Sequence, residues 1–162
     1  MKRESRRVLL AVAVLALVLS VSGLPALAQD KPADNMQIVR EKIRADKKLF
    51  VAEAMDLTES EAKGFWQVYD NYQKDLMKLN DRTIRMIKDY HDNYQLMTNE
   101  LARMLTDEFI AIKAEQQKLL VSYLPQFRTV LPDIKVARYY QIENKISAVV
   151  NYDLATNIPL VK

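Results

Sequence analysis

The stretch that decides the fold runs from Thr58 to Tyr90 and reads TESEAKGFWQVYDNYQKDLMKLNDRTIRMIKDY. Its apolar side chains recur at alternating steps of four and three residues, which is the rhythm of a coiled-coil helix. The members of this seam are Phe65, Tyr69, Tyr72, Leu76, Leu79, Thr83, Met86 and Tyr90. A helix from Thr58 to about Tyr94 would be roughly 55 Å long at 1.5 Å per residue. Such a helix requires a partner helix that covers its seam.

The start of this helix is marked by a helix-capping motif at Leu57, Thr58 and Glu61. Thr58 and Glu61 fit a capping box, in which the threonine hydroxyl accepts from the amide three residues on. The glutamate carboxylate accepts in return from the threonine amide. The motif therefore predicts that one helix ends at Asp56-Leu57 and that a long one begins directly afterwards.

One further helix is expected before the long one, and another is expected after it. The first runs from about Met36 to Met55, with apolar residues at helical spacing at Val39, Ile43, Phe50 and Ala54. After the long helix, residues 93–99 contain a turn, and Thr98 or Asn99 can cap the next helix. This third helix carries Leu101, Leu105, Ile112, Leu119 and Tyr123. It is expected to pack antiparallel against the long helix, as a short connection requires.

Proline marks the end of the third helix. Pro125 lacks an amide hydrogen and clashes with the preceding turn, so the helix should bend or stop near Leu124 and resume as a short turn through Val130. A fourth helix is expected from Ile134 to Val150, with one side formed by Tyr139, Ile142, Ile146 and Val149. The tail, residues 151–162, is apolar enough to dock on the rest of the protein.

Composition supports the same fold class. Beyond residue 28 the chain has one glycine, Gly64, four prolines and no cysteine, which are too few turn residues for a β-sandwich. Alanine, leucine, lysine, glutamate, glutamine and methionine are plentiful. The sequence predicts an all-α protein, an extended four-helix structure built on a long, bent antiparallel helical hairpin. Residues 36–162 are expected to form a single helical domain.

Residues 1–28 have the layout of an export signal. Four basic side chains precede an apolar run at residues 8–21, and Ala26-Leu27-Ala28 provides a small-residue cleavage site. Cleavage after Ala28 is expected, so that the periplasmic protein begins at Gln29 with a disordered lead over residues 29–35. The alternative is an uncleaved segment that anchors the chain in the inner membrane.

The charge of the mature chain argues against nucleic-acid binding. The first 28 residues hold four of the 24 basic side chains and one of the 21 acidic ones, so 20 of each remain. No block of lysine and arginine that could follow a phosphate backbone lies beyond the signal. From Gln29 onward no stretch approaches the roughly 20 apolar residues of a membrane span.

The sequence contains few residues in arrangements that support catalysis. His91 has no second histidine or cysteine to complete a zinc site, and it is expected to be a surface residue near a helix end. Glu59 and Glu61 are two residues apart, so on a helix they point in different directions and do not form an acid/base pair. We expect no enzyme activity, no catalytic residue, no metal and no cofactor.

Residues 54–61, Ala-Met-Asp-Leu-Thr-Glu-Ser-Glu, resemble the signature of the Spy and CpxP family of small periplasmic helical proteins, named for a repeated Leu-Thr-x-x-Gln. Glu61 stands at the glutamine position. The matching second place, Leu131-Pro132-Asp133-Ile134-Lys135, departs at the threonine and glutamine positions. The resemblance implies a bent hairpin that dimerises into a shallow cradle and holds unfolded polypeptides without ATP, or restrains an envelope-stress sensor.

The expected function is therefore protein binding in the periplasm. The leading hypothesis is an ATP-independent holding chaperone for unfolded or envelope proteins, and the alternative is a structural or regulatory partner that forms a coiled-coil homodimer or docks on a sensor. Trp66 falls one position off the seam, so it either packs under another helix or lies exposed. The candidate protein-binding residues are Met55, Phe65, Trp66, Tyr69, Tyr139 and Tyr140.

Overall fold

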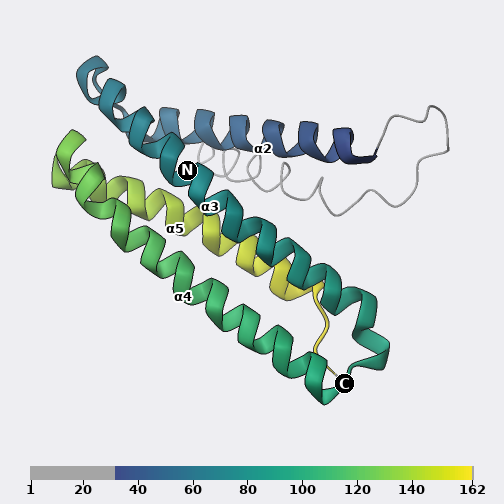
Figure 1. Cartoon of the computed structure of the whole chain (residues 1–162). Helices are drawn as coiled ribbons and strands as arrows, with labels where there is room; N and C mark the ends of the chain where they lie inside the picture. Colours follow the sequence, from purple (N-terminus) through teal and green to yellow (C-terminus); the bar gives the residue numbers. More distant parts are fainter. Residues whose placement is uncertain (1–31, 162) are drawn as a thin grey trace. The chain divides into compact units, whose positions relative to one another are not determined.

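The computed structural model describes residues 32–161, with side chains described for Lys42 and for residues 44–161. Every regular element in this part of the chain is helical, which confirms the all-α prediction (Figure 1). The elements are α2 (Pro32–Met55), α3 (Glu59–Asn93), the 3₁₀ turn η1 (Tyr94–Leu96), α4 (Asn99–Val130) and α5 (Asp133–Asn157). The expected signal segment, its cleavage site at Ala26, Ala28 and Gln29, and the start of the lead lie outside the described residues.

Two helices extend beyond their expected bounds. α2 begins at Pro32 rather than at Met36, because proline has a helical φ and its missing amide is harmless in the first helical turn. α5 continues to Asn157 instead of ending at Val150. The amide of Ile158 still donates to the carbonyl of Leu154 at 2.9 Å, and the proline that follows then prevents a further turn.

Of the two outcomes expected at Pro125, a stop of α4 near Leu124 is wrong, whereas a bend stays a prediction. The helix continues through this proline to Val130. Tyr123 and Phe127, which flank Pro125 on the same face of the helix, are both buried against α3. Packing on both sides of the proline therefore keeps the helix in register, although proline removes one backbone hydrogen bond.

By contacts between residues the chain divides into two compact units, and each is described by itself. The hairpin unit comprises Leu57–Arg138 together with residues 159–161. The second unit comprises Tyr139–Ile158 and the described residues up to Asp56. The expected single domain over residues 36–162 stays a prediction.

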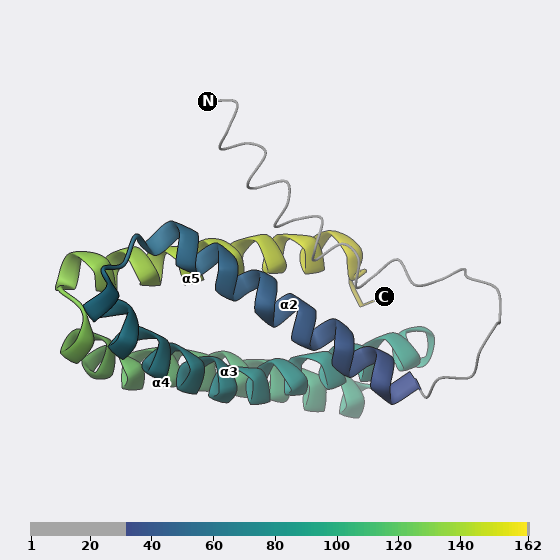
Figure 2. The same cartoon turned by 90° about the horizontal axis from the view of Figure 1, so that it is seen from above.

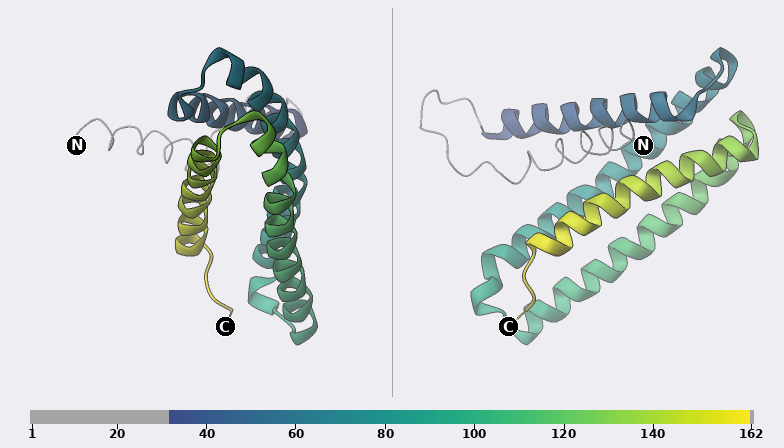
Figure 3. Two further views of the ribbon diagram at one scale, coloured as in Figure 1. Left: turned by 90° about the vertical axis from the view of Figure 1, so that its left-hand side faces the viewer. Right: turned by 180° about the vertical axis from the view of Figure 1, so that it is seen from behind.

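In the hairpin unit α3 and α4 lie side by side and run antiparallel (Figures 2 and 3). Phe65, near the start of α3, contacts Phe127, near the end of α4, with 5.8 Å between ring centroids. Tyr72 and Tyr123 meet edge to face at 5.4 Å. Farther along the seam, Thr83 and Tyr90 are only half-buried. The aromatic core therefore occupies the end of the hairpin remote from its turn.

The second unit joins α2 to the greater part of α5. Nζ of Lys47 on α2 pairs with Oε2 of Glu143 on α5 at 2.9 Å, and both side chains are largely buried. The buried residues near the end of α2 are Val51 and Met55, whereas Phe50 and Ala54 are half-exposed. The buried stripe thus lies one residue beyond the expected one, because two adjacent stripes with a four-residue step fit the same short helical pattern.

Candidate functional site

The six candidate binding residues divide by burial. Four are fully buried: Met55, Phe65, Tyr69 and Tyr139. Trp66 and Tyr140 are half-exposed. A partner protein can touch only exposed surface, so the four buried side chains serve packing. Of the eight seam residues of α3, half are buried and the other half, Leu76, Thr83, Met86 and Tyr90, are half-buried.

Trp66 is held by its aromatic neighbours. Its ring meets Phe65 edge to face at 4.9 Å and Tyr69 at 5.3 Å. Edge-to-face contacts at these distances stabilise an aromatic pair beyond simple burial. Trp66 is therefore a rigid side chain at the edge of the core, with part of its surface open to solvent.

One side of the hairpin carries a row of apolar side chains, here called the apolar flank. On α3, Trp66, Met77 and Ile84 each directly follow a seam residue and so lie about 100° around the helix from the seam. On α4, Leu120 and Leu124 directly follow the seam residues Leu119 and Tyr123, and Phe109 lies on the same side, about 60° around the helix from Ile112. In an antiparallel pair, residues that follow the seam fall on the same side of both helices. Met77, Ile84 and Phe109 are 40%, 48% and 44% exposed.

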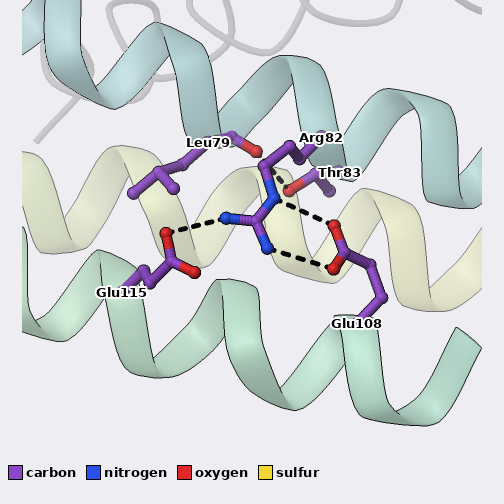
Figure 4. Close-up of polar contacts among 5 residues, drawn as sticks. All are labelled: Leu79, Arg82, Thr83, Glu108 and Glu115. Atoms are coloured by element: carbon purple, nitrogen blue, oxygen red, sulfur yellow. Dashed lines mark hydrogen bonds and ion pairs between the residues drawn. The ribbon is translucent and has the colours of Figure 1, made fainter. Parts of the chain in front are cut away.

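The opposite side, the polar flank, carries charged residues. They are Arg82 of α3, which directly precedes the seam residue Thr83, and Glu108 and Glu115 of α4. Arg82 of α3 makes a two-pronged ion pair with Glu108 of α4, from Nε to Oε1 at 2.9 Å and from Nη2 to Oε2 at 3.0 Å (Figure 4). Its Nη1 donates to Oε2 of Glu115 at 2.7 Å. These contacts raise the pKa of Arg82, and the guanidinium lowers the pKa of Glu108. Arg82 thus links α3 to α4 in the part of the hairpin that lies beyond the aromatic core.

A second polar contact lies closer to the core. The hydroxyl of Tyr123 donates to Oδ2 of Asp75 at 2.7 Å. Burial and this hydrogen bond raise the pKa of Tyr123 to about 12. The pKa of Asp75 is lowered, first by Lys78 and then by Tyr123. The phenol is therefore a neutral donor, and the polar flank is built for stability rather than for acid/base chemistry.

The capping motif connects two distant parts of the hairpin unit. The amide of Thr58 donates to Oε2 of Glu61 at 2.8 Å, and the amide of Glu61 donates to the Thr58 hydroxyl at 3.4 Å. Nζ of Lys135 donates to the same Oε2 at 2.5 Å. Lys135, the Thr58 amide and the Thr58 hydroxyl all donate to this carboxylate, and together they lower the pKa of Glu61 to about 2. Leu57, the first residue of the motif, is half-buried.

Glu61 and Lys135 occupy the glutamine positions of the first and the second motif. The two places at which the sequence departs from Leu-Thr-x-x-Gln are therefore in direct contact as an ion pair. A glutamate and a lysine here connect the start of α3 to the start of α5 by opposite charge.

Among the described side chains, no cluster of three or more histidine, cysteine, aspartate or glutamate residues could hold a metal ion. His91 is exposed, and its Nδ1 lies 3.3 Å from Oδ1 of its neighbour Asp92. None of the described helices is both long enough and apolar enough to cross a membrane.

The fold and the surface define an all-helical protein built around an antiparallel hairpin with one polar and one apolar flank. Comparison with protein-family models, with curated proteins and with solved structures gave no match to the chain. The function of the chain is therefore inferred from its own residues.

Sequence reasoning missed the exposed residues of the apolar flank, Met77, Ile84 and Phe109. The signal was present, since Met77 and Ile84 directly follow the seam residues Leu76 and Thr83. These two residues make the apolar stripe of α3 wider than one partner helix can cover. The tie between Arg82 and the two glutamates was missed as well, although Glu108 and Glu115 share a helical face through their seven-residue spacing.

Proposed function

We propose that this protein is exported to the periplasm and binds other proteins there, as an ATP-independent holding chaperone for unfolded or envelope proteins. The observation that carries the proposal is the apolar flank, which remains partly exposed beside the seam where α3 packs on α4. Large side chains that stay partly exposed in a row are typical of surfaces that contact other proteins.

The composition of the apolar flank fits varied clients. Met77 is flexible and polarizable, which suits a surface that adapts to different partners. Full burial of a side chain of this size is worth about 1.5–3 kcal/mol, so a few of them support binding that is weak and readily reversed. The resemblance of residues 54–61 to the Spy and CpxP signature supports the same class of function.

A second candidate function is that of a dimeric structural or regulatory partner. α4 carries exposed apolar residues on the face opposite its seam, with Ile110 60% and Val121 58% exposed. Together with Ala114 they form the outer row of α4. A homodimer or a sensor domain could cover this row, which is separate from the apolar flank.

Suppression of client aggregation tests the main proposal. Residues 29–162 would be mixed without nucleotide with a reduced, unfolding client, beside a Met77→Ser/Ile84→Ser variant. We expect suppression near equal molar ratio by the unaltered chain and weaker suppression by this variant. The matched control is Ile110→Ser/Val121→Ser, which changes the outer row of α4 and should suppress as well as the unaltered chain.

One result would contradict the holding function, and another would contradict the surface proposed for it. Failure to suppress aggregation at severalfold excess would rule it out for that client class, and equal activity of the flank variant would rule out the apolar flank as its surface. Sedimentation analysis addresses the second candidate: a concentration-dependent dimer that is lost in the outer-row variant would favour the dimeric partner.

A further inference from the structure

A tyrosine of the hairpin binds the C-terminal segment of the chain. After α5 ends at Asn157, residues 159–161 belong to the hairpin unit and lie near its turn (Figure 1). The hydroxyl of Tyr90 on α3 donates to the carbonyl oxygen of Pro159 at 2.7 Å. The expectation of a docked tail thus has a specific contact, and it is polar rather than apolar.

Tyr90 belongs to a small aromatic site. Its ring lies 5.7 Å from the ring of Tyr94, the first residue of η1, and both side chains are half-buried. Burial raises the pKa of Tyr90, so its hydroxyl is protonated and available as a donor. The site offers two aromatic faces and one hydrogen-bond donor close together.

The tail is only lightly held at this site. Leu160 is 88% exposed and Val161 is 55% exposed, so the side chain of Leu160 has little contact with the hairpin. Proline restricts its own φ and favours an extended conformation of the residue before it, Ile158. An extended segment leaves its carbonyl groups without internal partners, so an external hydroxyl can bind them.

We propose that the Tyr90–Tyr94 pair is a binding site for extended, apolar peptide segments that contain proline, and that residues 159–161 occupy it as an internal competitor. Aromatic side chains that pack on proline and donate to a neighbouring carbonyl are a recurring mode of peptide recognition. The inference rests on the proposed function, since it names one class of segment that the protein binds. A client segment must then displace the tail before it can bind.

The test uses a labelled copy of the tail as its probe. A fluorescent peptide with the sequence Asn-Ile-Pro-Leu-Val, blocked at both ends, is titrated with the protein, and anisotropy gives the dissociation constant. The tail variant ends at Ile158, which removes the competitor together with the Pro159 carbonyl and leaves the site intact. We expect it to bind the peptide about fivefold more tightly than the unaltered chain, as the loss of one competing hydrogen bond implies.

The site itself is tested in the background of the tail variant. Tyr90→Phe keeps the ring and removes the donor, and it should weaken peptide binding about fivefold. Tyr152→Phe is the matched control, because Tyr152 is exposed on α5, and it should leave the affinity unchanged. Circular dichroism verifies that each variant keeps its helical content.

The outcomes separate this inference from the proposed function. Equal peptide affinity of the unaltered chain and the tail variant would overturn the inference, as would a Tyr90→Phe variant that binds normally. If the chain suppresses aggregation but the tail variant does not bind the peptide, only the inference fails. If the peptide binds as expected while aggregation is not suppressed, the holding function fails and the peptide site remains.

Discussion

Gly64 shows how a single residue brings two helices close together. A methyl group at this position would lie 2.8 Å from Cγ1 and 3.0 Å from Cβ of Val130, so only glycine permits this approach of α3 to the end of α4. Glycine within a helix is less favourable than alanine by about 1 kcal/mol. Close packing of the hairpin outweighs this local preference.

Replacement of Gly64 by alanine is expected to destabilise the protein by about 1–2 kcal/mol, because the clash with Val130 exceeds the gain in helix propensity. Urea unfolding followed by circular dichroism measures this change. In a Val130→Gly background the same substitution should be neutral or stabilising, since the nearest remaining atom of residue 130 is then Cα, at 4.0 Å from the methyl group. An increase in stability from Gly64→Ala alone would contradict the close contact.

The ion pair between Glu61 and Lys135 makes stability depend on pH. The pKa of Glu61 is about 2 in the folded protein, against 4.5 ordinarily. The stabilisation is therefore fully present above about pH 4.5 and is lost as the pH falls toward 2. We expect the urea midpoint to fall over this range, and Glu61→Gln to fall less. Equal pH dependence of the two proteins would show that other carboxylates dominate.

At the scale of the element, helix ends follow local chemistry. Thr98 begins α4 by accepting from the amide of Leu101 at 3.2 Å, as Thr58 begins α3. α2 ends at Met55 because Asp56 adopts a left-handed conformation with φ 48°, which aspartate tolerates better than most residues. Side chains with short polar groups thus set where these helices start and stop.

Pro125 is an element-scale weakness in α4. Pro125→Ala restores the missing amide donor and should stabilise the protein by up to about 3 kcal/mol, which thermal unfolding measures. Pro132→Ala is the control, since Pro132 directly precedes α5 and removes no bond from a helix interior. It should change stability by no more than about 0.5 kcal/mol. A loss of stability in Pro125→Ala would mean that the hairpin requires the local geometry that proline imposes.

At the scale of the molecule, the hairpin unit is held differently at its two ends. Buried aromatic rings join α3 and α4 far from the turn, whereas Arg82, Glu108 and Glu115 join them nearer to it. Apolar burial resists local opening better than partly exposed ion pairs do. The turn end should therefore open more often than the aromatic end.

Hydrogen exchange measures this difference. Amides in residues 86–105 should exchange faster than those around Phe65 and Phe127. Arg82→Met keeps the apolar stem but removes the cation that Glu108 and Glu115 share, so it should accelerate exchange at the turn end only. The control is Arg103→Met at an exposed position of α4. Uniform exchange along the hairpin would contradict the division into two ends.

Several elements could be predicted because their causes are local. The spacing of Phe65, Tyr69 and Tyr72 indicated which face of α3 is buried, and the threonine caps indicated where two helices begin. Helix ends without a capping signal were less certain, so the start of α2 and the end of α5 were misplaced. The stop expected at Pro125 was wrong, because packing of the residues on both sides overrode the local preference of proline for a helix break.

The sequence by itself determined the helical class, the seam and the caps, since these depend on the spacing and chemistry of near neighbours. Only the tertiary structure decided which seam aromatics are fully buried and which charges meet across the hairpin unit. Glu61 and Lys135 are 74 residues apart, and Arg82 lies 26 residues from Glu108. The register of one helix against another sets such contacts, and that register depends on how all the side chains between them pack together.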